Sequence, residues 1–265
     1  MNFSNLKYSF AMLAAVAGVM VSCNDNDDNG FDDSGSKVVM GNHRVFILNE
    51  GTWGMNNANI SYYDPSVSGD VISDIFALQN GMQLGDNGND LITYRDNMYV
   101  AVYGSNYIAR LNSAGVEMNR NEFASDPDLQ GGVRSIEAED GYIYASFYGG
   151  VIAKIDSNTL EVVAKLATSG MNLEDLAIED GKLYVANSYG VIDGNYVYFN
   201  ELIVVDLHSF TQLPSITVTS NPNRVIEADD KIFVISNDYS QESYVLQMVE
   251  PRNGNKVTVL GFATD

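Results

Sequence analysis

Residues 179–187 read EDGKLYVAN, an acidic turn followed by a short apolar strand that carries a tyrosine. Units of this kind recur five times along the chain of 265 residues. The aromatic residues at the matching position are Phe46, Tyr99, Tyr144, Tyr184 and Phe233, which are 53, 45, 40 and 49 residues apart. A repeat of about this length, built from short strands, is typical of the blades of a β-propeller.

Three further strand types accompany this aromatic strand, which we call strand b. Strand a precedes it, at 90–95, 134–139, 174–179 and 224–229. Strand c follows, at 60–64, 108–112, 152–156, 202–206 and 246–250, and strand d comes last, at 71–76, 116–123, 160–166, 213–218 and 256–260. The a–b links read DN, DG, DG and DK, which indicate tight hairpins. The sequence therefore predicts an all-β fold, a β-propeller of four-stranded antiparallel blades. A β-sandwich and an open β-solenoid are the alternatives, and the repeat length with its four-strand rhythm favours the propeller.

The strand count predicts a ring that does not close. Strands b, c and d each occur five times, but strand a occurs only four times, because the first unit starts at its b strand. Residues 261–265 are too few for a further strand and its turn. We therefore expect about five blades, an unpaired strand edge near 45–48 that favours association, and a chain that is truncated or comes from a shortened gene product.

The N-terminal segment 1–22 has the features of an export signal. Lys7 supplies the positive charge and residues 10–21 supply an apolar run too short for a permanent membrane span. The only cysteine, Cys23, follows the small Ser22, which resembles a bacterial lipoprotein signal with Cys23 as the acylated residue. Residues 23–36 are rich in aspartate and predict a solvated tether, which leaves 37–265 for the propeller domain.

The charge of the chain limits its partners. Asp and Glu number 35 against 14 Lys and Arg, a formal net charge of −21. A field of this sign repels nucleic acid and anionic membrane surfaces, so contact with a membrane is expected only through the lipid.

No enzyme motif is present, and we expect no catalytic residue and no metal. The two histidines, His43 and His208, fall in different blades. The segment GDNGND, 85–90, resembles a calcium loop only superficially, because it lacks alternating ligands and a terminal glutamate.

A ligand-binding face is predicted where the b–c and d–a links emerge together. These links combine aromatic side chains with many Asn and Gly, which suits a neutral ligand rich in amides or hydroxyls. The expected ligand-binding residues are Trp53, Asn56, Asn57, Tyr103, Asn106, Tyr148, Asn187, Tyr189, Tyr196, Tyr198, Asn237 and Tyr239. The plainer interpretation is that Asn and Gly shape turns and that the tyrosines pack on blade edges.

A charged ring is expected around the central channel. Its members stand at the start of strand a and alternate in sign: Asp90, Arg134, Glu174 and Arg224. A structural ring of ion pairs and a ligand-binding role are both open.

Residues 46–65, FILNEGTWGMNNANISYYDP, and 80–91, NGMQLGDNGNDL, together with the acidic lipoprotein start, resemble the YncE-like, surface-layer-type seven-bladed propeller lipoproteins of Bacteroidota. That group includes surface corrinoid-binding lipoproteins, which hand vitamin B12 to a TonB-dependent outer-membrane transporter. The resemblance implies a lipid-anchored protein on the cell surface, with a corrinoid as bound ligand rather than as cofactor. Seven blades are the rule there, and this chain has material for about five.

Two other functions remain open. One is a cell-surface module that binds a glycan or a protein. The other is a propeller enzyme of the lactonase or lyase type, which needs a metal held by carboxylates from several blades or a histidine base.

Overall fold

The computed structural model describes residues 30–238 and 243–261. The chain divides into a short unit, Met1–Gly30, and a compact unit, Phe31–Asp265. Residues 1–22, for which the sequence predicts an export signal, Cys23 and the first part of the predicted tether lie outside the described residues. No helix in the described ranges is long and apolar enough to cross a membrane.

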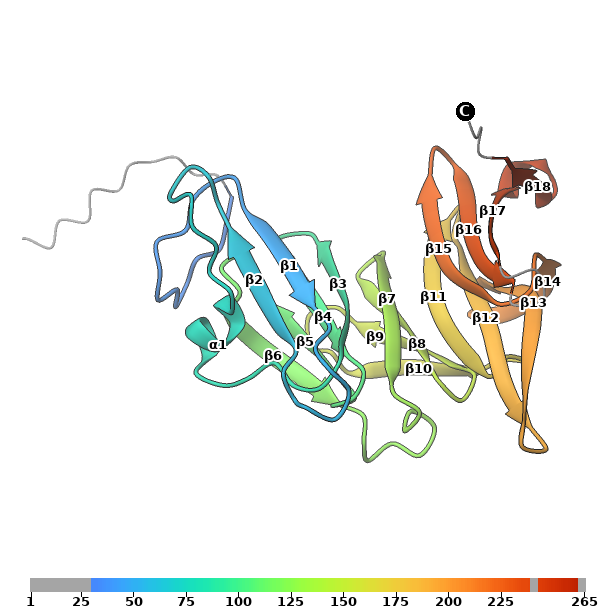
Figure 1. Cartoon of the computed structure of the whole chain (residues 1–265), viewed down its shortest axis with the longest axis horizontal. Helices are drawn as coiled ribbons and strands as arrows, with labels where there is room; N and C mark the ends of the chain where they lie inside the picture. Colours follow the sequence, from blue (N-terminus) through green and yellow to red (C-terminus); the bar gives the residue numbers. More distant parts are fainter. Residues whose placement is uncertain (1–29, 239–242, 262–265) are drawn as a thin grey trace, which may run out of the picture. The chain divides into compact units, whose positions relative to one another are not determined.

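The compact unit is an all-β propeller with five blades in an unclosed ring. Four blades are antiparallel sheets of four strands that follow one another in chain order, and the first blade has two strands (Figure 1). The first two blades are β1(Val45–Asn49) and β2(Asn59–Tyr63), then β3(Gly88–Tyr94), β4(Asn97–Val102), β5(Tyr107–Leu111) and β6(Glu117–Glu122). The third is β7(Val133–Glu139), β8(Tyr142–Phe147), β9(Val151–Asp156) and β10(Val162–Ala167). The fourth is β11(Asn172–Glu179), β12(Lys182–Ile192), β13(Asn195–Asp206) and β14(Thr211–Thr217), and the fifth is β15(Pro222–Ala228), β16(Lys231–Asp238), β17(Ser243–Glu250) and β18(Lys256–Leu260).

Two of the four a–b hairpins have the expected Asp-Gly turn. Asp140 and Gly141 both have positive φ, +50° and +88°, and so do Asp180 and Gly181, at +52° and +65°. Two consecutive positive φ values define the type I′ turn, whose twist matches that of the flanking strands. The Asp-Gly pairs therefore fix the register of this hairpin in the third and fourth blades. In the second and fifth blades the expected DN and DK links are wrong by one residue, because the turns are formed by Arg95–Asp96 and Asp229–Asp230.

The core consists of apolar layers between successive blades. Tyr99 of β4 packs with Ile136 and Ile143 of the next blade, and Tyr184 of β12 packs with Ile232 and Val234. The strand-b aromatics Tyr99, Tyr144 and Tyr184 have relative exposures of 1%, 2% and 0%. Phe233, at the same position in the last blade, is only partly buried. Tyr99, Tyr144 and Tyr184 are thus each buried by the blade that follows. Phe46 of the first blade packs on the core but stays partly exposed.

The first blade differs from the prediction for 71–76. Ile72 forms an isolated bridge to Tyr62, and the chain then turns into a short helix, α1(Ile75–Asn80). Asp74 caps this helix, because its Oδ1 accepts the N–H of Ala77 at 2.9 Å. The expected strand d of this blade is therefore wrong, and Ile75 and Phe76 reach the core from a helix instead.

The ring is open at the first blade, as the strand count predicts. Among the described strands, β1 pairs only with β2. Val45 and Ile47 are correspondingly exposed.

Candidate functional site

A continuous row of aromatic rings crosses four blades on the predicted face. Trp53 lies 5.4 Å from Tyr103, Tyr103 lies 5.4 Å from Tyr148, and Tyr148 lies 6.4 Å from Tyr189, measured between ring centroids. Tyr196 extends the row, 5.8 Å from Tyr189. We call these five residues the aromatic row. The repeat explains the row, because Tyr103, Tyr148 and Tyr189 each follow strand b of their blade.

Arg134 supports the middle of the row. Its guanidinium carbon lies 4.7 Å from the ring centre of Tyr103 and 4.9 Å from that of Tyr148. Glu174 neutralises it through an ion pair of 2.6 Å and also accepts the hydroxyl of Tyr148. Burial, followed by the Glu174 charge, raises the pKa of Tyr148. The tyrosine is therefore a neutral hydrogen-bond donor that is held in place, and the row carries no net charge at this point.

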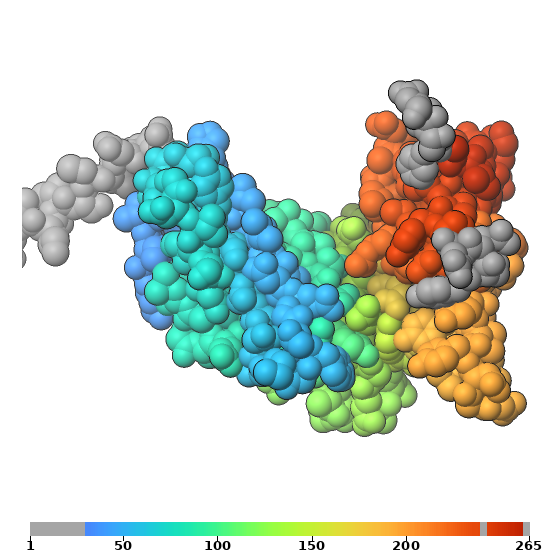
Figure 2. Space-filling view, in the orientation of Figure 1, coloured from blue at the N-terminus to red at the C-terminus, as the bar shows by residue number. Residues whose placement is uncertain are grey.

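The segment 187–201, expected as a loop, is a long two-stranded arm. Strand β12 continues to Ile192 and β13 begins at Asn195, and the turn is formed by Asp193 and Gly194, with φ of +52° and +79°. The Asp-Gly pair has the same hairpin chemistry as the a–b links. The arm places Tyr189 opposite Tyr198 in the β ladder. Figure 2 shows the tip of the arm (orange) and the β1–β2 loop (blue) on the lower side of the surface.

Two of the predicted ligand-binding amides have structural roles instead. Asn106 is buried, donates to the carbonyl of Leu129 and accepts the N–H of Val133. Asn187 is fully buried between the N–H of Met171 and the carboxylate of Glu201. Because these amides satisfy neighbouring backbone and side-chain groups, neither reaches the surface, and their assignment to the ligand site is wrong.

The remaining predicted amides lie near the surface. Asn56 donates to Gln83, and Asn57 accepts the N–H of Thr52, which shapes the loop that carries Trp53. Asn237 is partly buried at the end of β16. Tyr239 lies outside the described residues.

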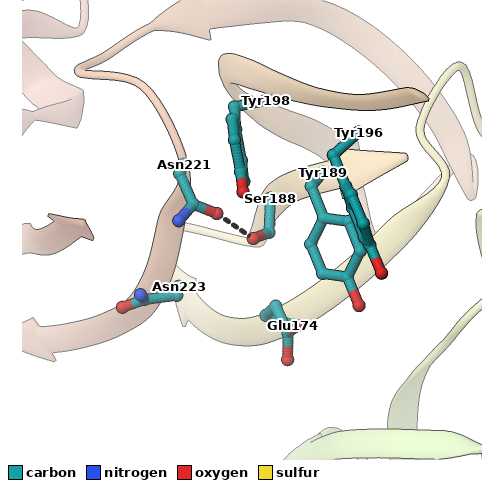
Figure 3. Close-up of a pocket in the computed structure, with 7 residues that line it drawn as sticks. All are labelled: Glu174, Ser188, Tyr189, Tyr196, Tyr198, Asn221 and Asn223. Atoms are coloured by element: carbon teal, nitrogen blue, oxygen red, sulfur yellow. Dashed lines mark hydrogen bonds between the residues drawn. The ribbon is translucent and has the colours of Figure 1, made fainter. Parts of the chain in front are cut away.

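A pocket of about 280 Å³ adjoins the end of the row (Figure 3). Tyr189, Tyr196 and Tyr198 come from the arm, Asn221 and Asn223 from the fifth blade, and Glu174 and Ser188 from the fourth. Ser188 donates to Asn221, so the back of the pocket is fixed. Ser188, Asn221 and Asn223 were not among the predicted ligand-binding residues. Asn221 lies in the link before β15 and Asn223 near the start of β15.

The charged channel residues do not share one register position. Strand pairing sets Tyr94, Glu139, Glu179 and Ala228 at equivalent positions next to the a–b turns. Four residues before these positions, the equivalent residues of the four strands are Asp90, Ser135, Asp175 and Arg224. Arg134 and Glu174 lie one residue earlier in their strands. The predicted single ring is therefore wrong by one residue in two blades. Arg134 and Glu174 still pair across blades, and Arg224 lies 4.0 Å from Asp175.

Hydrogen bonds connect the inner strands of neighbouring blades. The hydroxyl of Ser135 lies 2.8 Å from a carboxylate oxygen of Asp90 and 2.8 Å from one of Asp175. Asp90 also accepts the N–H of Ile136, and Asp175 accepts that of Val225. Burial raises the pKa of both carboxyl groups. These contacts form a chain that links the second, third, fourth and fifth blades through their inner strands.

Glu137 lines a cavity of about 270 Å³ together with Asp90, Asp175 and Glu227. Burial and then the neighbouring carboxylates raise its pKa to about 7. Because the folded-state pKa lies above that of the unfolded chain, its contribution to stability is complete below about pH 4.5 and is lost as pH rises through about 7. When the pH is changed from about 5 to about 8, we expect the free energy of unfolding of Glu137→Gln to rise by about 1–2 kcal/mol relative to that of the parent protein.

Urea unfolding at the two pH values measures this difference. Glu161→Gln, at an exposed position, is the matched control and should show no such gain. A gain of the same size in both variants would contradict the assignment to Glu137.

In residues 30–238 and 243–261, no three His, Cys, Asp or Glu side chains are grouped so that they could hold a metal ion. This includes the segment 85–90. There Asp86 instead accepts the N–H of Gly54, with 3.0 Å and 2.9 Å to its two carboxylate oxygens, and so anchors the loop that carries Trp53.

The fold and the row define a β-propeller with a candidate ligand-binding face. No protein-family model matches the chain, and no curated protein matches its sequence. Solved structures with a similar fold include hydrazine synthase of Kuenenia stuttgartiensis (TM-score 0.55, 13% identity, 77% of this chain and 60% of that one). The computationally designed protein Ika8 (0.54, 10%, 81% and 57%) and the WD40 repeats of RRP9 (0.52, 10%, 65% and 50%) are also similar. The chain thus spans 50% to 60% of the length of these structures, and at such identities the likeness shows the fold alone.

Proposed function

We propose that this protein captures a corrinoid on the aromatic row. The observation that carries the proposal is the unbroken series of ring contacts from Trp53 to Tyr196, with centroid separations of 5.4 to 6.4 Å. Trp53 and Tyr196 are 64% and 70% exposed, so both ends of the row are open to a ligand. A soluble domain rarely presents so many contiguous aromatic rings without a partner.

The chemistry of the row suits a large, flat ligand with a polar rim. Aromatic rings cover an apolar face, and the exposed amides of Asn56 and Asn57 near Trp53 can meet amide groups at its edge. The ion pair of Arg134 and Glu174 is internal to the site, so a ligand meets no unpaired charge there. A corrin ring rimmed with amides has this combination.

The cellular setting follows from the resemblance of residues 46–65 and 80–91 to surface propeller lipoproteins. In this proposal Cys23 carries the lipid anchor at the outer membrane, and a TonB-dependent outer-membrane transporter receives the ligand. Loss of lipid labelling in Cys23→Ala would support the anchor, and unchanged labelling would refute it.

Titration of cobinamide and cobalamin, followed by their visible absorbance, tests the proposed ligand. Trp53→Ala and Tyr148→Phe probe the end and the middle of the row. Loss of the Trp53 ring should weaken binding about 30-fold, since losing one aromatic anchor of a binding surface costs about 2 kcal/mol. Tyr148→Phe keeps the ring and should change the affinity less.

Asp180→Asn is the control, because Asp180 lies in an a–b turn at the opposite ends of the strands. It should bind as the parent protein does. No binding of either corrinoid by the parent protein would remove the corrinoid and leave the surface-interaction function. Weakening by Asp180→Asn alone would place the ligand on the other face.

A further inference from the structure

The pocket at the end of the row has an apolar side and a polar side. Tyr189, Tyr196 and Tyr198 form one wall, and Asn221, Asn223 and Glu174 lie across from them (Figure 3). The wall belongs to the β12–β13 arm, and the polar side belongs to the inner strands β11 and β15 and the link before β15. A ligand in the pocket therefore contacts aromatic rings on one face and hydrogen-bonding groups on the other.

The polar groups divide into fixed ones and free ones. Asn221 accepts from Ser188 and donates to the carbonyl of Asn237. Glu174 accepts from Arg134 and Tyr148. Within the part of the chain that the structure describes, the Asn223 amide and the hydroxyls of Tyr189 and Tyr196 make no hydrogen bond. These three groups are available to a ligand, and they supply both donors and acceptors.

The pocket also restricts the charge and the size of the ligand that it can bind. Its lining contains no lysine, arginine or histidine, and its one carboxylate is already paired, so neither an anion nor a cation finds a counter-charge. A volume of about 280 Å³ lies at the lower end of the range for small-molecule sites, which fits one ring with its substituents. An apolar ring would leave the Asn223 amide without a hydrogen-bond partner.

We propose that this pocket is a carbohydrate subsite that binds one neutral pyranose ring. The C–H face of the sugar lies against the tyrosine wall, and its hydroxyl groups bond to Asn223 and to the free tyrosine hydroxyls. Glu174 accepts a further hydroxyl hydrogen on Oε1, which otherwise accepts only from Tyr148, while Arg134 holds the other carboxylate oxygen. The subsite does not require the corrinoid, which is assigned to the whole row.

Saturation-transfer NMR with the methyl α-glycosides of glucose, mannose and galactose, and with N-acetylglucosamine, tests this site. At least one of these probes should give saturable binding to the parent protein. Asn223→Ala removes a free hydrogen-bonding group and should weaken that binding about tenfold. Tyr196→Phe removes a hydroxyl, keeps the wall and should weaken it less.

Trp53→Ala is the matched control, since Trp53 stands at the far end of the row. It should change sugar binding by less than about twofold while it weakens corrinoid binding, so the two proposals fail separately. The absence of saturable binding for all four probes would overturn the subsite. Unchanged binding in Asn223→Ala, or equal loss in Trp53→Ala, would overturn it as well.

Discussion

Replacing Tyr144 by alanine should lower the free energy of unfolding by about 3–5 kcal/mol. Tyr144 is 2% exposed and packs with Leu176, Leu183 and Val185 of the next blade. Removal of its ring leaves a cavity between two sheets that are each held by hydrogen bonds, so the cavity cannot collapse readily. The midpoint of urea unfolding, at unchanged slope, measures the loss.

Phe233→Ala is the matched control for this substitution. It removes an aromatic ring at the equivalent position of the last blade, where no described strand covers it. We expect a cost of about 1–2 kcal/mol there, because part of the ring already contacts water. Equal costs at the two positions would show that burial by the following blade is not what makes the repeat stable.

Replacing Arg134 by methionine should cost about 3–5 kcal/mol, because it leaves the carboxylate of Glu174 buried without its counter-charge. The side chains of Arg134 and Glu174 are 17% and 11% exposed, so water replaces the lost partner only in part. The substitution also removes the cation between the rings of Tyr103 and Tyr148. Urea unfolding measures the loss of stability, and corrinoid titration reports whether the middle of the row is disturbed.

Arg224→Met provides the comparison, since Arg224 starts the inner strand of another blade. Its side chain is 58% exposed and its nearest carboxylate, that of Asp175, lies 4.0 Å away. We expect a cost below about 1 kcal/mol. Adding Glu174→Gln to Arg134→Met should recover part of the stability, and no recovery would show that an unpaired charge is not the cause.

The sequence was sufficient for the fold because the repeat is set by local chemistry. The Asp-Gly turns fix the a–b hairpins of the third and fourth blades, and the aromatic residue of strand b identifies the layer between blades. The helix α1 was missed because its six residues are fewer than two helical turns, too short for a helical periodicity. The arm was missed although Asp193 and Gly194 carry the same turn signal, because the aromatic and amide residues around them favoured a loop.

Only part of the candidate site was predicted from the sequence. The difference between the residues that were predicted correctly and those that were not has a physical cause. The tyrosines that follow strand b come together because equivalent backbone positions repeat their geometry from blade to blade. Whether an amide points outward depends on the neighbouring blade, and Asn106 and Asn187 turn inward to satisfy backbone N–H groups there. The charged ring was misaligned by one residue because Asp90 lies one residue closer to its a–b turn than Arg134 does to the turn of the next blade.

A hydroxyl group carries one hydrogen, yet the oxygen of Ser135 lies 2.8 Å from a carboxylate oxygen of Asp90 and 2.8 Å from one of Asp175. The single hydrogen is either shared between the two carboxylate oxygens or bonded to one of them while the other carboxyl group supplies a hydrogen of its own. In the unfolded chain near neutral pH neither aspartate holds such a hydrogen. Because burial raises the pKa of both carboxyl groups, assembly of the blades favours the uptake of a proton from water at this point.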